Sequence, residues 1–81
     1  MLSCPETGIR MTVRTDQPGV QVYSANFLTC RKGKHGQTYH EREALCLETQ
    51  HAPNSLACGF EPSALLPADT EFRTETVYSF Y

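Results

Sequence analysis

Residues 9–23 have the sequence IRMTVRTDQPGVQVY, in which hydrophobic and polar side chains alternate on both sides of a Pro-Gly pair. Alternation with a period of two predicts β-strands that bury one face and expose the other to water. Pro18 presets its own φ, and we expect Gly19 to supply the positive φ that a type II turn requires. This stretch therefore predicts two strands separated by a tight turn.

The rest of the chain favours strands and loops over helices. Residues 44–49 form a short apolar run, and residues 72–80 alternate like the first segment. Segments 29–38 and 50–63 contain glycines, prolines and charged residues that predict exposed, irregular loops. No window of eleven or more residues keeps a helical period, so the predicted fold class is all-β, with four or five antiparallel strands.

Eighty-one residues form at most one small domain, or part of a larger one, and we expect no boundary within residues 1–81. A lone sheet of four or five strands has free edges and an uncovered face. It either covers itself as a small β-sandwich or belongs to a larger sheet assembly. The second arrangement is favoured, because the strands offer too few facing residues to fill two layers.

The charge balance argues against two classes of partner. Seven Lys and Arg residues against nine Asp and Glu residues give a net charge of −2, so no basic surplus exists to bind nucleic acid or an anionic membrane surface. No run approaches the roughly 18 apolar residues that a membrane helix requires. The first residues lack the pattern of a secretory signal, so we expect a cytoplasmic protein.

Neither the cysteines nor the histidines have the spacing of a metal site. The cysteines are Cys4, Cys30, Cys46 and Cys58, and none forms a C-x-x-C pair. Two alternatives stay open for them, namely four reduced thiols in the cytosol and a disulfide framework. We expect Cys46, inside an apolar run, to be a buried small hydrophobe.

Glu48 is an acidic residue inside the strand-like run LCLETQ, residues 45–50. Removing an unpaired carboxylate from water costs several kcal/mol and favours its neutral form, which suits a general base working near neutral pH. The alternatives are that Glu48 points out of the sheet into water or pairs with an arginine such as Arg42. The pattern alone leaves these alternatives open.

Gln21 and Tyr23 occupy alternating positions on one predicted strand and therefore share a face. An amide that hydrogen-bonds hydroxyl groups, beside a ring that stacks on C–H groups, suits the binding of a sugar. The alternative is a solvated strand face that binds nothing.

Two longer motifs resemble segments of the aldose 1-epimerases, or galactose mutarotases. Residues 15–28, TDQPGVQVYSANFL, resemble the family segment T-x-x-P-G-[VL]-Q-[VF]-Y-[TS]-[GA]-N-F-L. Residues 45–51, LCLETQH, resemble F-C-L-E-T-Q-[HN]. Both motifs occur in the family order and at nearly the family separation. With weaker similarity on both flanks, the resemblance covers nearly the whole chain but only about the last quarter of a family member.

The resemblance implies an antiparallel sheet fragment of a galactose mutarotase-like β-supersandwich. It also implies the interconversion of the α and β anomers of aldohexoses such as galactose and glucose. In that chemistry a glutamate removes the proton of the C1 hydroxyl while a histidine protonates the ring oxygen. By motif position, Glu48 would be the general base and Gln21 the sugar-binding glutamine, with no cofactor and no metal.

The resemblance places the acid histidine upstream of this chain, and no histidine here matches it; they are His35, His40 and His51. We therefore expect the isolated chain to be inactive and to require the missing N-terminal portion. The chain also departs from the family at residues 43–45 and 56–62. Two alternatives remain: a non-catalytic carbohydrate-binding module, and a truncated β-module that self-associates through its sheet edges.

Overall fold

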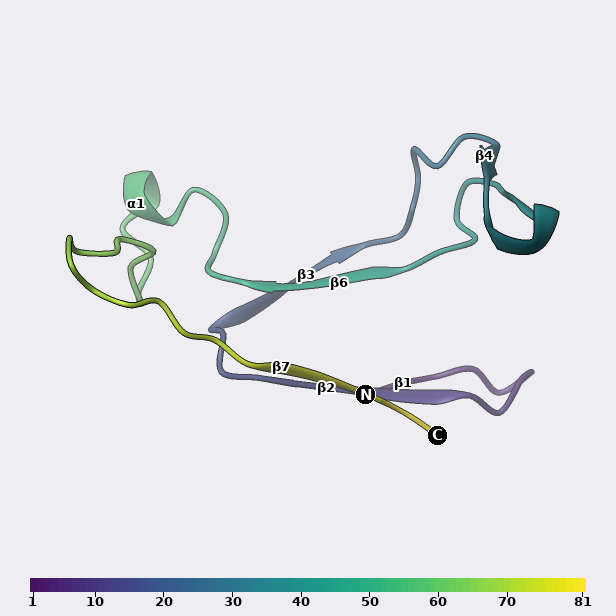
Figure 1. Cartoon of the computed structure of the whole chain (residues 1–81), viewed down its shortest axis with the longest axis horizontal. Coiled ribbons are helices and arrows are strands. Elements are labelled where there is room, and N and C mark those ends of the chain that lie inside the picture. The colour runs from purple at the N-terminus through teal and green to yellow at the C-terminus, as the bar shows by residue number, and fades with distance from the viewer.

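Short antiparallel strands dominate the computed structural model, which describes all 81 residues (Figure 1). The strands are β1 (Leu2–Ser3), β2 (Arg10–Thr15), β3 (Gly19–Tyr23), β4 (Arg31–Lys32), β5 (Thr38–Tyr39), β6 (Cys46–Gln50) and β7 (Thr76–Phe80). The helical parts are the 3₁₀ turn η1 (Lys34–Gly36) and the single turn α1 (Ser55–Cys58). The strands form three sheets, ordered β1-β2-β7, β3-β6 and β4-β5, which confirms the all-β class.

The β1-β2-β7 sheet brings the two ends of the chain together (Figure 1). Its register pairs Met11 with both Leu2 and Phe80, and Val13 with Tyr78. Directly opposite residues share a face, and side chains two positions apart along a strand share it too. These five hydrophobic side chains therefore form one apolar face of the sheet.

The β3-β6 sheet is joined to β2 and β7 by hydroxyl groups. The Thr76 hydroxyl lies 2.7 Å from the hydroxyl of Thr49 in β6 and 3.0 Å from the hydroxyl of Thr15 in β2. The Tyr78 hydroxyl donates a hydrogen bond of 2.8 Å to the carbonyl oxygen of Leu47. Strand β7 thus holds the two sheets next to each other.

The space between these two sheets is not filled. Only Ala25 and Ser55 are buried in the whole chain. Its accessible surface is 7002 Å², whereas a compact folded protein of 9.1 kDa exposes about 4,900 Å². The radius of gyration is 16.5 Å, against about 12 Å for a compact chain of this length. The strands offer too few facing residues to enclose a core, as the sequence indicated.

Gly19 differs from the predicted turn geometry. It is not among the residues with a positive φ, and it begins β3 directly after a bend at residues 16–18. The reason is topological, because β2 and β3 belong to different sheets and the bend passes the chain from one sheet to the other. No hairpin closes here, so no residue has to adopt the left-handed conformation.

The predicted last strand is shorter than expected, since β7 begins at Thr76 rather than at Phe72. The residues just before it bind a side chain in place of a neighbouring strand. The Thr74 hydroxyl donates a hydrogen bond of 2.6 Å to Oδ1 of Asp16, and the amide of Glu75 donates one of 3.1 Å to the same oxygen.

The predicted loops contain two short elements that sequence periodicity did not indicate. One is the small β4–β5 hairpin within residues 29–39. The other is α1, a single turn that ends at Gly59, whose φ is +68°. The structure contains no helix that is long and apolar enough to cross a membrane.

We predict that Thr76→Val weakens the link between the sheets. Valine keeps the shape of threonine but removes two hydroxyl–hydroxyl contacts, each worth about 1 kcal/mol, so the free energy of unfolding should fall by about 1–2 kcal/mol. Urea denaturation followed by circular dichroism measures the change. The matched control is Thr12→Val, since the Thr12 hydroxyl makes no hydrogen bond within the chain. Equal losses in the two variants would contradict the proposed link.

Candidate functional site

Gln21 and Glu48 face each other across strands β3 and β6. The antiparallel register pairs Gln21 with Glu48 and Gly19 with Gln50. In such pairs the Cβ atoms are about 4.5–5.5 Å apart. The amide and the carboxylate, 27 residues apart in the sequence, therefore lie next to each other on one face of the sheet.

The environment of Glu48 is not the desolvated one that its apolar neighbours suggested. Glu48 is exposed, because no other layer covers this face of the two-stranded sheet. Its neighbour Leu47 lies on the opposite face, where it contributes to an apolar hollow with Met11 and Val13. The apolar run LCLETQ thus surrounds Glu48 in the sequence but not in space.

Glu48 also has no cationic partner. Arg42, the partner considered from the sequence, donates from Nε to Oδ1 of Asn26 at 3.4 Å. The one ion pair in the chain joins Arg73 and Glu71 at 4.0 Å. Both oxygens of the Glu48 carboxylate are consequently free to accept hydrogen bonds from a bound molecule.

A small hollow of about 110 Å³ lies beside Gln21. Gln21 and Gln50 line it from the two strands, and the half-buried His51 lines it just after β6. The Gln50 amide donates a hydrogen bond of 3.2 Å to the carbonyl oxygen of His51, which holds that amide along the rim. Gly19, opposite Gln50, adds no side chain and leaves the hollow open.

Tyr23 shares the face of Gln21 by its position on β3, as the alternation predicted. Its hydroxyl, however, accepts a hydrogen bond of 2.9 Å from the backbone amide of Phe27. The phenol oxygen therefore supports the loop that follows β3. The half-buried ring and the O–H donor of Tyr23 are left to contact a ligand.

The three histidines are dispersed in the structure as well. His35 lies in η1, and His40 places Nδ1 3.5 Å from the sulfur of Cys30. Only His51 lies next to Gln21. No group of three or more histidine, cysteine, aspartate or glutamate side chains is arranged to hold a metal ion.

All four cysteines are free, so the structure contains no disulfide framework. Cys46 is half-buried in β6, rather than buried as its apolar surroundings suggested, because the face that it shares with Glu48 is uncovered. The other three thiols are exposed.

Comparison with known proteins identifies the family. Residues 1–79 match the family model described as Aldose 1-epimerase. The chain belongs to the aldose 1-epimerase family. It is 43% identical over 75 residues to the galactose mutarotase of Mus musculus and 39% identical over 75 residues to that of Homo sapiens. It is also 33% identical over 55 residues to the aldose 1-epimerase of Haemophilus influenzae.

The alignments cover most of this chain but only a small part of the length of each relative. The two mammalian alignments include 91% of the chain and 22% of each relative, and the Haemophilus alignment includes 68% of the chain and 16% of the relative. The chain thus spans about a fifth of the length of the curated relatives it matches. No solved structure gives a significant match.

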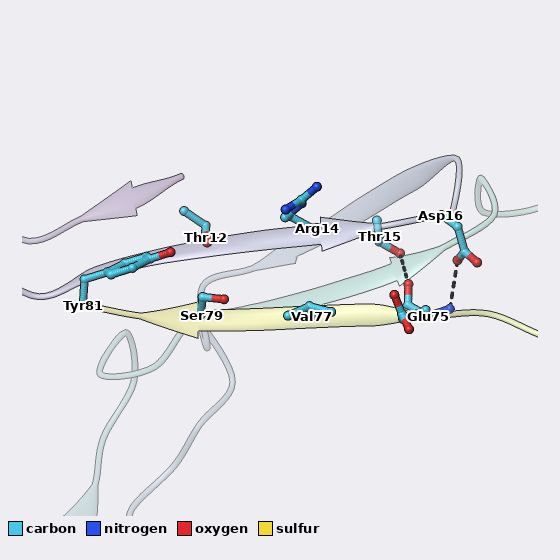
Figure 2. Close-up of a pocket in the computed structure, with 8 residues that line it drawn as sticks. All are labelled: Thr12, Arg14, Thr15, Asp16, Glu75, Val77, Ser79 and Tyr81. Carbon is cyan, nitrogen blue, oxygen red and sulfur yellow. Dashed lines mark hydrogen bonds between the residues drawn. The ribbon is translucent and has the colours of Figure 1, made fainter.

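A second polar surface of this epimerase-family chain was not predicted from the sequence. A hollow of about 490 Å³ lies over β2 and β7, and Figure 2 draws the residues that line it. Its lining consists of Thr12, Arg14, Thr15, Asp16, Glu75, Val77, Ser79 and Tyr81. The Thr15 hydroxyl donates to the carbonyl oxygen of Glu75 at 3.2 Å, and the Glu75 amide donates to Asp16 (Figure 2). These contacts fasten the start of β7 to the end of β2, and no local sequence signal could have revealed them.

Hydrogen bonds at this second surface lower the pKa of Asp16. The Thr74 hydroxyl has the largest effect and the Glu75 amide the next, because both donate to the ionised carboxylate. A carboxylate whose pKa falls on folding stabilises the folded state above its unfolded pKa of about 3.9. That contribution is lost as the pH falls through the lower, folded value.

We predict that Thr74→Val moves the pKa of Asp16 upward, towards that of a free carboxyl group, because the strongest donor is lost. An NMR titration of the Asp16 carboxyl carbon measures the shift. The stability of the variant should also fall less than that of the wild type as the pH drops below about 4. Thr70→Val is the matched control, since the Thr70 hydroxyl donates to the Ala68 carbonyl oxygen and does not touch Asp16. An unchanged Asp16 titration in Thr74→Val would refute the assignment.

Proposed function

We propose that this chain supplies the general base, Glu48, and a sugar-binding amide, Gln21, to an aldose 1-epimerase that interconverts the α and β anomers of aldohexoses such as galactose and glucose. The observation that carries the proposal is the register pairing of Gln21 with Glu48 on one open face. The family match over residues 1–79 supports it, as do the relatives described as galactose mutarotase and aldose 1-epimerase.

In the proposed reaction, the Glu48 carboxylate accepts the proton of the C1 hydroxyl of the sugar. The electron pair of that O–H bond forms the C1 carbonyl, and the bond between C1 and the ring oxygen breaks. The ring oxygen takes a proton from an acid, the C1–C2 bond rotates, and ring closure on the other face of the carbonyl reverses each step. Glu48 suits the first step because no group within the chain occupies its oxygens.

Gln21 suits the binding of the sugar beside the base. Its side-chain amide offers two N–H donors and one carbonyl acceptor, so it can hydrogen-bond neighbouring hydroxyl groups in either sense. Its place opposite Glu48 would hold such hydroxyls next to C1. The hollow lined by Gln21, Gln50 and His51 adds polar surface at the same edge.

The acid would come from outside this chain. His35 and His40 lie in the loop between β3 and β6, and no histidine stands on the face of Gln21 and Glu48 within the two strands. Nearly four fifths of the length of the relatives lies outside the match, and we propose that the corresponding portion supplies the acid. The four free thiols support a reducing, cytoplasmic setting for this assembly.

The exposure of Glu48 favours one second candidate, in which the chain binds a sugar without turning it over. A carboxylate open to water on an uncovered face can accept hydrogen bonds from sugar hydroxyls. Without an acid, ring opening would not follow. A chemical-shift titration of the chain alone with galactose distinguishes this candidate, since the enzymatic proposal expects weak or no binding until the missing portion is present.

The test uses an assembly of this chain with the part of the mouse galactose mutarotase that the chain does not match. In this assembly we predict that Glu48→Gln lowers kcat by about 10²–10⁴-fold, because glutamine cannot accept the C1 proton. The optical rotation of freshly dissolved α-D-galactose measures the rate. The chain alone should give only the uncatalysed rate. Glu41→Gln is the control, since Glu41 is exposed and lies outside the β3–β6 face. Full activity in Glu48→Gln would exclude Glu48 as the base.

We predict that Gln21→Leu lowers kcat/KM of the same assembly by about 5–150-fold, the equivalent of the roughly 1–3 kcal/mol that an unpaired hydroxyl costs. Leucine keeps the approximate size of glutamine but makes no hydrogen bond. The pH profile of kcat should not change, because the base remains in place. Gln37→Leu, in the loop after η1, is the control and should leave kcat/KM unchanged. An unaltered kcat/KM in Gln21→Leu would contradict a role in binding.

A further inference from the structure

We propose that Cys30 is a site of reversible modification by a small anionic disulfide, the class to which glutathione disulfide belongs. A histidine contacts the sulfur of Cys30, and the hairpin that begins beside it has basic side chains but no acidic ones. The site lies in the loop between β3 and β6, and neither Gln21 nor Glu48 takes part in it. The proposal is therefore independent of the proposed function.

The register of the β4–β5 hairpin brings Cys30 and His40 together. Arg31, the first residue of β4, pairs with Tyr39, the last residue of β5. Cys30 directly precedes Arg31 and His40 directly follows Tyr39, so the same register sets the thiol opposite the imidazole. Sγ of Cys30 lies 3.5 Å from Nδ1 of His40, a hydrogen bond in which either atom can be the donor. A nucleophile is thus within reach of a base that can take up its proton.

Glu43 holds the backbone of His40 in this position. The His40 amide donates a hydrogen bond of 2.7 Å to Oε2 of Glu43, and the Glu43 amide donates one of 3.3 Å to the His40 carbonyl oxygen. The amide of Arg42, between them, donates to the carbonyl oxygen of the buried Ala25 at 3.1 Å. A nucleophile, a base and a third group that positions the base form the usual arrangement of an activated side chain.

The charge of the hairpin selects the kind of disulfide. Residues 29–40 include Arg31, Lys32 and Lys34 but no aspartate or glutamate, although the whole chain has a net charge of −2. These three cations are free, because the one ion pair of the chain lies elsewhere. The hairpin stands at one end of the elongated molecule (Figure 1). Positive charge beside a thiol stabilises the thiolate and attracts anionic reagents, so an anionic disulfide fits this site better than a neutral one.

The other three cysteines lack this combination of base and cations. Hydrogen bonds from the hydroxyl and the amide of Thr7 lower the pKa of Cys4, but no histidine contacts that thiol to take up its proton. Cys58 is contacted by a neutral side-chain amide at 3.6 Å. Cys46 is half-buried within β6. The exposed Cys4 and Cys58 are consequently internal controls for the reactivity of Cys30.

The reaction is a thiol–disulfide exchange. Cys30 gives its proton to Nδ1 of His40, and the thiolate attacks one sulfur of glutathione disulfide. The S–S bond of the reagent breaks as a new S–S bond forms to Sγ of Cys30, so Cys30 is oxidised and the second glutathione is reduced. That glutathione leaves as a thiolate, which takes the proton from His40. Attack of free glutathione on the mixed disulfide restores Cys30.

The test treats the full 81-residue chain with glutathione disulfide and follows the mixed disulfide at each cysteine by mass spectrometry of its peptides. We expect Cys30 to react about tenfold faster than Cys58, and faster than Cys4, because base and cations act on Cys30 alone. In urea the difference should disappear, since the register that joins Cys30 to His40 is lost. Equal rates in the absence of urea, or a faster reaction at Cys4, would overturn the proposal.

His40→Asn tests the base, because asparagine can still hydrogen-bond the thiol but cannot take up its proton. We expect the rate at Cys30 to fall about threefold, a modest loss because a more stable thiolate is also a weaker nucleophile. His35→Asn is the matched control. His35 lies in η1, contacts no cysteine and has a φ of +57°, a conformation that asparagine tolerates. Equal rates in the two variants would rule out His40 as the base.

The double variant Lys32→Gln, Lys34→Gln tests the charge. It should slow the reaction of Cys30 with glutathione disulfide about threefold at low ionic strength, because the attraction for the anionic reagent is reduced. The reaction with neutral bis(2-hydroxyethyl) disulfide should change much less. An equal effect on both reagents would reject an anionic disulfide as the class that this site selects.

Discussion

The antiparallel register of β3 and β6 determines what both faces of that sheet can do. It sets Gln21 opposite Glu48 on the open face and Val22 opposite Leu47 on the face towards β2 and β7. A slip of one residue in one strand would turn its set of side chains to the other face. The polar pair Gln21–Glu48 and the apolar pair Val22–Leu47 are therefore fixed by the same register, and neither can move without the other.

Polar contacts, rather than a filled core, hold this pairing against the rest of the chain. Thr76 contacts hydroxyl groups from both β2 and β6, and Tyr78 donates to a carbonyl oxygen of β6. Such bonds specify how the sheets align, but each contributes only about 1 kcal/mol to stability. The alignment of the sheets is thus specified with little apolar burial, since only Ala25 and Ser55 are buried.

The sequence predicted those strands whose pattern of hydrophobic and polar residues lies within one contiguous segment. Alternation around Met11 and Val13 predicted β2, and the alternation of residues 20–23 predicted β3. The position of Glu48 on a strand was predicted because the residues of that strand are contiguous in the sequence. Its exposure could not be predicted, since the solvation of a side chain depends on which element covers it and not on its neighbours in the chain.

The contacts that sequence reasoning missed are long-range or too short to have a period. Asp16 and Thr74 are 58 residues apart, so no local pattern joins them. Helix α1 has four residues, fewer than the helical period needs to become visible. The extended conformation of Gly19 depends on which sheet receives the next strand, which is a property of topology.

The loop between β3 and β6 is closed at its base by one residue. The carbonyl oxygen of the buried Ala25 accepts hydrogen bonds from the amides of both Leu28 and Arg42, so the two arms of the loop meet before the strands begin. Residues beyond that point, including the β4–β5 hairpin, extend from a closed base. Insertions or deletions near the hairpin tip would therefore leave the register of β3 and β6 untouched.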